Sequence, residues 1–221
     1  VAFVADYNNN RIRRVAADGA TTTVAGSGDA GLKNGKGDQA WFNRPAGVAV
    51  DGAETVFVSD RYNNAIRQVL KDGTTTTLAG NGAAAWADGK GAAARFNQPI
   101  GIAHANSGLL YVADWANHRV RVISGDGTVS TLAGGTAGYV DGAGNQARFN
   151  GPIGVAVDGA GNVYVADYHN HRLRRVSAEG VVTTLAGSGA QGALDGDPLT
   201  AQFRYPWSVA SDSAGRIYIA D

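Results

Sequence analysis

The chain has 221 residues, of which 44% are hydrophobic and 17% are charged, and its formal net charge is zero. This composition is typical of a folded domain, and the zero net charge argues against nucleic acid or an anionic membrane as a partner held by overall charge. The lack of cysteine excludes disulfides, thiolate chemistry and cysteine-based metal sites. No apolar run is long enough to predict insertion into a membrane.

Internal repetition is the strongest signal along the chain. A short strand-like segment ends in Asp every 53 or 54 residues, and a Phe that precedes a Pro by three residues recurs with the same period. The Asp residues are Asp6, Asp60, Asp114, Asp167 and Asp221, and the Phe residues are Phe42, Phe96, Phe149 and Phe203. Such a period indicates one structural unit that is repeated along the chain.

One unit, beginning at Pro152, predicts four strands in chain order. Each predicted strand is rich in β-branched residues, and Gly, Asp and Asn separate it from the next one. The predicted strands are Gly154–Val157, Val163–Asp167, Arg172–Val176 and Val181–Gly187. In the second turn we expect an Asn to adopt the left-handed conformation that closes a hairpin. The Asn residues at this position are Asn9, Asn63, Asn117 and Asn170.

Four short strands in each repeat of this length predict an all-β fold, a β-propeller built of four-stranded antiparallel blades. The remaining segment, Ser188–Tyr205, is too long for a hairpin loop. A propeller needs such a connection, because the outermost strand of one blade must lead to the innermost strand of the next. We expect the recurrent Phe and Pro near the end of this connection to pack between neighbouring blades.

The segments YVADYHNHRLRRV, VADWANHRVRVI and VADYNNNRIRRV resemble the NHL repeat, named for its Asn-His-Leu signature. The flanking pattern ARFNGPIGVAVD is similar to the long-linker members of this family in surface, secreted and multidomain proteins. Two departures occur. The second repeat has Asn64 and Ala65 in place of the His-Arg pair, and Asn34 stands where later repeats have Asp88 and Asp141.

The resemblance implies a six-bladed propeller, of which this chain carries four repeats. We therefore expect residues 1–221 to form a single NHL-type propeller or propeller fragment. The repeats cover approximately 1–46, 47–100, 101–153 and 154–207, and 208–221 begins a further blade. In the alternative, residues 208–211 pair with the N-terminal strands and close a smaller ring.

The repeated charged residues predict a structural role, because a catalytic site is usually a single asymmetric constellation. The Asp carboxylate is expected to accept hydrogen bonds from backbone N–H groups of the following turn, or from an Arg of a neighbouring strand. His118 and His171 are expected to fasten the turn through a ring N–H. The signature residues are Asp6, Asp60, Asp114, Asp167, Asn9, Asn63, Asn117, Asn170, Arg13, Arg67, Arg121 and Arg174.

We expect no catalytic residue, cofactor or metal site. His169 and His171 straddle a turn, so they are poorly placed as joint ligands. The resemblance extends to lactonases and amidating lyases that hold metal in the central channel, and the lactonase type relies on Glu, which occurs here only as Glu54 and Glu179. His104 is assigned to the position that Asp51, Asp158 and Asp212 hold in other repeats, near the mouth of the channel.

These features predict a non-enzymatic interaction or scaffold module that binds a protein or glycan partner through its blade loops. The resemblance places it within a larger extracellular or cell-surface protein, in a multidomain or filamentous assembly. Candidate partner-binding residues are Trp86, Tyr139, Trp115, His104 and His169. The alternative is RNA binding through Arg13, Arg14, Arg174 and Arg175, which the zero net charge disfavours. A metal-dependent lactonase-like or lyase-like enzyme is the third possibility.

Overall fold

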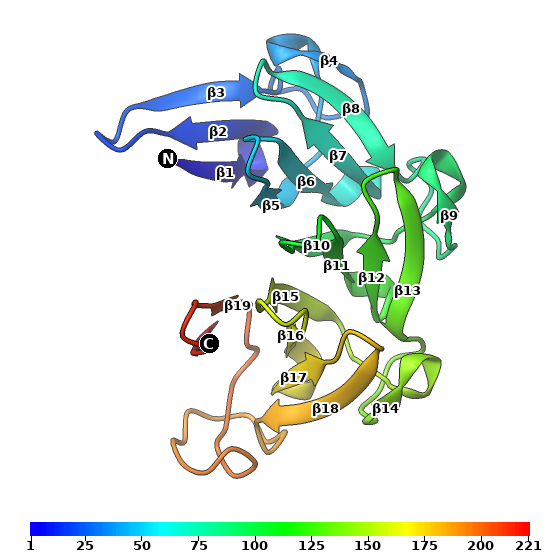
Figure 1. The fold of residues 1–221 in the computed structure, drawn as a ribbon, viewed down its shortest axis with the longest axis vertical. Coiled ribbons are helices and arrows are strands. Elements are labelled where there is room, and N and C mark those ends of the chain that lie inside the picture. Colours follow the sequence, from blue (N-terminus) through cyan, green and yellow to red (C-terminus); the bar gives the residue numbers. More distant parts are fainter.

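Short β-rich segments alternate with Gly, Asp and Asn turns along the whole chain, and they form antiparallel sheets set around an axis (Figure 1). The computed structural model describes all residues from 1 to 221. Four successive sheets form blades 1 to 4 of a propeller, and a two-stranded hairpin follows them. The prediction of an all-β propeller is confirmed.

The strands of each blade follow one another outward from the axis, so that β5, β10 and β15 are innermost in blades 2, 3 and 4. Blade 1 contains β1 (Ala2–Asp6), β2 (Arg11–Val15) and β3 (Thr21–Ala25). Blade 2 contains β5 (Pro45–Val50), β6 (Val56–Asp60), β7 (Ala65–Val69) and β8 (Thr74–Ala79). Blade 3 contains β10 (Pro99–His104), β11 (Leu110–Asp114), β12 (Arg119–Ile123) and β13 (Thr128–Gly134). Blade 4 contains β15 (Pro152–Val157), β16 (Val163–Asp167), β17 (Arg172–Val176) and β18 (Val181–Ala186), and the hairpin contains β19 (Ser208–Ser211) and β20 (Ile217–Ala220).

A three-residue 3-10 turn joins the second and third strands of each repeat. These turns are η1 (Tyr7–Asn9), η3 (Arg61–Asn63), η5 (Trp115–Asn117) and η7 (Tyr168–Asn170). The left-handed residue is the next one in each case, namely Asn10, Asn64, His118 and His171, with φ from 48° to 55°. The expectation that Asn9, Asn63, Asn117 and Asn170 adopt this conformation is wrong. The 3-10 turn moves the chain reversal one residue further along.

The linkers between blades add a short fifth strand that the sequence pattern did not predict. These strands are β4 (Gly35–Lys36), β9 (Gly89–Lys90) and β14 (Gly142–Ala143), and the turns η2 (Gly37–Gln39), η4 (Gly91–Ala93) and η6 (Gly144–Gln146) follow them. Each fifth strand pairs with the outermost strand of the blade that follows it in the chain. Part of an outer edge that would otherwise offer unpaired N–H and C=O groups is thereby covered.

The recurrent Phe packs between neighbouring blades, as expected. Phe42 is fully buried and contacts Ile12 of blade 1 together with Val56 and Val69 of blade 2. Phe96 and Phe149 are equally buried in the cores that join blades 2 and 3, and blades 3 and 4. Each pair of neighbouring blades therefore shares an apolar core of its own.

The C-terminal hairpin and blade 1 lie at the two ends of the arc (Figure 1). Residues 208–211 form β19 and pair with β20, not with the N-terminal strands. The alternative pairing that would close a four-bladed ring is therefore not formed. None of the helical segments is long and apolar enough to cross a membrane.

Candidate binding surface

The repeated Asp and Arg form a buried ion pair in each of blades 2, 3 and 4. Asp60 accepts the N–H of Asn43 and the side-chain amide of Asn63, each at 2.8 Å, and the Arg67 guanidinium at 2.8 Å. Arg67 is fully buried and also donates to the carbonyl oxygens of Lys33 and Trp41, both in the preceding linker. Asp114–Arg121 and Asp167–Arg174 repeat this arrangement. Arg174 is therefore not part of an exposed basic face.

The backbone donor to this Asp comes from the preceding linker and not, as expected, from the following turn. Asn43, Asn97 and Asn150 donate their N–H groups to Asp60, Asp114 and Asp167. In blade 1 the pair is looser, because Arg13 and Asp6 lie 3.3 Å apart and both remain partly exposed. The signature residues thus tie the linker, the turn and the third strand together, which is a structural role.

Burial raises the pKa of the Asp60 carboxyl to about 6, although Arg67 and the hydrogen bonds from Asn63 and Asn43 act in the opposite direction. Burial likewise raises the pKa of Asp114 and of Asp167. The cost of removing each carboxylate from water is therefore only partly offset by its arginine.

His118 and His171 do not act through a ring N–H, so that expectation is wrong. The Nδ1 atom of His118 accepts the N–H of Gly151 at 3.1 Å, and Nδ1 of His171 accepts the N–H of Tyr205 at 3.2 Å. At the two earlier joints the side-chain oxygens of Asn10 and Asn64 accept the equivalent N–H groups. Burial, followed by the charge of Arg119, lowers the pKa of His118, and burial with His169 lowers that of His171. Neutral imidazole is the form that can accept.

One face of the propeller carries the residues just after each strand Asp and those just before each strand Pro, because Pro45, Pro99 and Pro152 pair with Asp60, Asp114 and Asp167. Aromatic and arginine side chains gather there in two stacked groups that meet at Gly151. We call the two groups together the aromatic–arginine belt. It consists of Tyr7, Arg44, Arg61, Tyr62, Trp115, Tyr168, His169, Tyr205 and Trp207.

The first half of the belt links blades 1, 2 and 3 through two arginines. The Arg44 guanidinium carbon lies 5.7 Å from the ring centre of Tyr7 and 5.3 Å from that of Tyr62. Arg61 lies 5.1 Å from the Tyr62 ring and 5.3 Å from the Trp115 ring. Such stacking holds flexible arginines in place and keeps their charge at the surface.

The second half of the belt consists of rings without an arginine. Tyr168 contacts His169, Tyr205 and Trp207, with ring centres 4.8, 4.9 and 5.7 Å apart. Gly151 brings the halves together, since a Cβ there would lie 2.8 Å from His169 and 2.9 Å from Trp115. The buried indole Nε1 of Trp115 has no hydrogen-bond partner. Trp115 and His169, both predicted from the sequence, are thus in one surface.

Trp86 and Tyr139 lie elsewhere, in the linkers at the outer rim. The Arg119 guanidinium carbon is 4.3 Å from the Trp86 ring centre, and that of Arg172 is 3.7 Å from the Tyr139 ring centre. Trp86 Nε1 also donates to the Thr131 hydroxyl at 3.1 Å. Both aromatic side chains nevertheless remain exposed, at 49% and 44%.

The assignment of His104 to the position of Asp51, Asp158 and Asp212 is wrong by one residue. His104 pairs with Leu110, as Val157 pairs with Val163. Ala105 holds the turn position instead, since its N–H bonds to Leu109 just as that of Asp158 bonds to Asn162. The His104 ring stacks on Phe57 with 5.7 Å between centres, at the end of β10 opposite to the belt.

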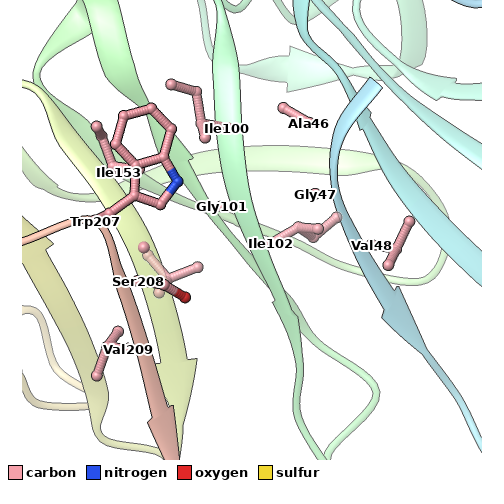
Figure 2. Close-up of a pocket in the computed structure, with 12 residues that line it drawn as sticks. Ala46, Gly47, Val48, Ile100, Gly101, Ile102, Ile153, Trp207, Ser208 and Val209 are labelled. Carbon is pink, nitrogen blue, oxygen red and sulfur yellow. The ribbon is translucent and has the colours of Figure 1, made fainter. Parts of the chain in front are cut away.

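The inner strands line a cavity of about 260 Å³ at the centre of the arc (Figure 2). Its lining residues are Ala, Gly, Val and Ile, together with Trp207 and Ser208, which are the only ones that carry side-chain polar atoms. A Cβ at Gly101 would collide with the carbonyl oxygen of Ile153, so glycine is required where neighbouring inner strands meet. No three His, Cys, Asp or Glu side chains are grouped so as to hold a metal.

Sequence reasoning missed Arg44, Arg61, Tyr62, Tyr205 and Trp207 as surface residues. The available signal was positional, because Tyr7, Arg61, Trp115 and Tyr168 all follow the strand Asp directly. The residues that precede each strand Pro lie on the same face. Only the pairing of that Pro with the strand Asp, which the structure shows, reveals this.

A family model, described as the NHL repeat, matches residues 42–69, 96–123 and 149–175. NHL repeat-containing protein 2 of Gallus gallus is 34% identical over 178 residues, which are 73% of this chain and 24% of that protein. The chloroplastic protein SUPPRESSOR OF QUENCHING 1 of Arabidopsis thaliana is 29% identical over 99% of this chain and 23% of its own length. The chain thus spans about a quarter of the length of these relatives.

Solved structures share the fold at low sequence identity. An auxiliary nutrient binding protein from Bacteroides thetaiotaomicron has a TM-score of 0.73 at 18% identity, over 97% of this chain and 51% of its own. A chain of a nidogen/laminin complex has a TM-score of 0.68 at 20% identity, over 99% and 66%. Virginiamycin B lyase from Staphylococcus aureus has a TM-score of 0.63 at 15% identity, over 99% and 58%.

Proposed function

The chain belongs to the NHL-repeat family, and on that premise we propose that it is a non-enzymatic interaction module whose main binding surface is the aromatic–arginine belt. The extent of the belt carries this proposal, since stacked rings and arginines run from Tyr7 to Trp115, and stacked rings continue from His169 to Trp207 on the other side of Gly151. Aromatic residues and arginine are the residues most enriched at the energetic centres of interfaces. The partner is a protein or a glycan.

Rigidity supports the proposal. Each belt residue lies in a 3-10 turn or directly beside a Pro at the end of a linker, and the buried Asp–Arg pairs hold the turns in blades 2 to 4. Loops that a rigid scaffold positions lose little conformational entropy on binding. Tyr62 and Trp207 are 38% and 53% exposed, so apolar area is available to a partner.

The test is a comparison of three forms of the chain on protein and glycan arrays. A belt variant carries Arg44→Ala, Tyr62→Ala and Trp207→Ala. A matched control carries three exposed changes outside the belt, at Leu70, Leu194 and Leu199, each to Ala. We expect the belt variant alone to lose the partners that the wild-type chain retains. Identical retention by all three forms would contradict the proposal.

One observation favours RNA binding. Proteins bind single-stranded nucleic acid through arginines and exposed aromatic rings, and the belt contains both. Two observations weigh against it. Arg174 is buried, and the formal net charge of the chain is zero. A filter-binding titration across salt decides the point. Salt-dependent retention of single-stranded RNA that the belt variant loses would replace the protein or glycan partner by RNA.

An enzyme of the lactonase or lyase type is the other alternative. The residues that line the central cavity include no Asp, Glu, His, Lys or Arg, which supports the non-enzymatic proposal, since proton transfer and metal ligation both need ionisable side chains. Turnover of lactones or cyclic depsipeptides by the purified chain, with and without added divalent cations, tests it. Turnover above background in either condition would overturn this part of the proposal.

We further propose that the module belongs to a larger extracellular or cell-surface protein. The much greater length of the curated relatives and the fold shared with a chain of the nidogen/laminin complex support this placement, whereas the chloroplastic relative points to another compartment. Surface labelling and fractionation of the source cells test it. Exclusive recovery from an internal compartment would contradict it.

A further inference from the structure

A cavity of about 570 Å³ lies at the outer rim, where blade 3 meets the linker that leads to blade 4. The stacked pair of Trp86 and Arg119 lines part of it. The next linker contributes Asn145, Gln146 and Arg148, and Trp86 is the only apolar residue in the lining. This polar cavity with one aromatic ring is separate from the belt.

The residues of this cavity can be compared with those at equivalent positions of two other joints, because the same joint recurs one repeat earlier and one repeat later. In this joint the four positions hold Trp86, Arg119, Asn145 and Gln146. In the earlier joint the same positions hold Leu32, Ala65, Ala92 and Ala93. In the later joint they hold Tyr139, Arg172, Leu199 and Thr200. Backbone pairing at the fifth strand is retained in blades 2, 3 and 4. The fold therefore does not require an aromatic ring, an arginine and two amides at this joint, and only this joint combines them.

The polar groups of this cavity are free for a ligand. Asn145, Gln146 and Arg148 are exposed, and no intramolecular hydrogen bond or ion pair engages their side chains. Asp88, the only carboxylate in the lining, is already held by the Arg121 guanidinium at 2.7 Å and by the Thr131 hydroxyl at 3.0 Å. Two cations, Arg119 and Arg148, thus face the cavity without a free anion.

Each of these groups matches one part of an acidic sugar. An indole ring offers an electron-rich face to the C–H groups of a pyranose. Carboxamides donate and accept at once, as adjacent sugar hydroxyls require, and guanidinium groups pair with carboxylates in planar geometry. We propose that this cavity binds an acidic saccharide, a hexuronate unit that packs on Trp86, bonds to Asn145 and Gln146, and pairs its carboxylate with Arg148. This inference goes beyond the proposed function, because it places a second binding site, for one class of glycan, outside the belt.

Calorimetric titration of the intact chain with tetragalacturonate tests the inference, with maltotetraose and inorganic phosphate as parallel probes. We expect saturable binding of tetragalacturonate, binding of maltotetraose weaker by about tenfold or more, and no displacement by phosphate at equal concentration. No saturable binding of tetragalacturonate would overturn the site. Equal binding of maltotetraose would overturn the acidic class, and displacement by phosphate would identify an adventitious anion only.

The sister joints supply variants that the fold tolerates. Trp86→Leu, the Asn145→Ala and Gln146→Ala pair, and Arg148→Gln introduce the residues found at Leu32, Ala92, Ala93 and Gln202. Each variant should weaken tetragalacturonate binding by about tenfold or more, whereas Tyr139→Leu and Trp207→Ala should leave it unchanged. Wild-type affinity in the Trp86 and amide variants would overturn the assignment. If tetragalacturonate fails to bind while the belt variant still loses its partners, this inference falls and the proposed function stands. If the belt variant also retains every partner, both fall.

Discussion

Blades 2 and 3 have the same strands, the same linker path and the same fully buried arginine, yet they differ around that arginine. Arg67 contacts one carboxylate, Asp60, and the neutral amide of Asn34, whereas Arg121 contacts the two carboxylates of Asp114 and Asp88. The joint that follows is closed by Asn64 after blade 2 and by His118 after blade 3. The strands, the linker path and the buried arginine, which the two blades share, hold the fold. The residues that differ between the blades are available for function.

The largest expected effect concerns the shared arginine. Arg67→Ala and Arg121→Ala each leave a buried carboxylate without its partner, which costs about 3–5 kcal/mol of unfolding free energy. Arg121→Ala should cost more, because it exposes Asp114 and Asp88 to each other's charge. Urea denaturation at pH 7 measures both. Arg175→Ala, at an exposed position, should change stability by less than about 0.5 kcal/mol, and equal losses in all three would refute the buried-pair explanation.

Arg121 and Arg67 each contact a second side chain, Asp88 and Asn34 respectively. Exchanging these two residue types should reverse the difference in stability between the two blades. Asp88→Asn is expected to destabilise the chain and Asn34→Asp to stabilise it, each by about 0.5–1 kcal/mol. A charged hydrogen bond contributes more than this when shielded, but Asp88 is 43% exposed and its charge is partly screened. The same denaturation experiment, repeated at high salt, should show both effects shrink. Changes of the same sign in the two variants would contradict the comparison.

The joints closed by Asn64 and by His118 should differ in how acid changes the stability of the fold. Because the folded chain lowers the pKa of His118 below its ordinary value of 6.5, this group stabilises the fold fully above that pH and loses its contribution as the pH falls through the folded pKa. His118→Asn should leave stability at pH 7.5 within about 1 kcal/mol of wild type and make it less sensitive to acid. Thermal unfolding from pH 7.5 to pH 5 measures this.

The matched control for the joint is Asn64→His, which places imidazole where blade 2 has an amide. It should add acid sensitivity to a joint that has none. Carboxylates such as Asp60 titrate in the same range, but they are common to all variants and cancel in the difference. An unchanged pH profile in both variants would show that Nδ1 does not hold the joint.

The last expected effect, similar in size to the exchange of Asp88 and Asn34, is the coupling between Trp86 and Arg119. A double-mutant cycle with Trp86→Leu and Arg119→Ala should give a coupling energy of about 0.5–1 kcal/mol, as for an exposed cation–π pair. Introducing Leu32→Trp together with Ala65→Arg should create a coupling of similar size in blade 2. Additive effects in both blades would show that the stacked pair is incidental.

Several elements followed from the residues directly. The β-branched runs, the turn residues and the 53- or 54-residue period predicted the strands and the blades, because these signals act over a few neighbouring residues. The positions of the left-handed turn residue and of His104 were each wrong by one residue, for different reasons. The left-handed residue comes later because a 3-10 turn precedes it. His104 was misaligned, because Asp51 and Asp158 follow Pro45 and Pro152 by six residues and the residue six positions after Pro99 is Ala105.

The belt illustrates the other limit. Tyr7, Arg44 and Tyr62 are far apart in the chain, and they meet because the blades turn about a common axis and place equivalent turns side by side. The cavity beside Trp86 likewise combines two linkers. The sequence by itself determined the repeat, the strands and the recurrence of Asp and Arg in each repeat, because a local pattern encodes each of them. Only the tertiary structure decided which deviating residues share a surface, because this depends on the rotation and packing of one blade against the next.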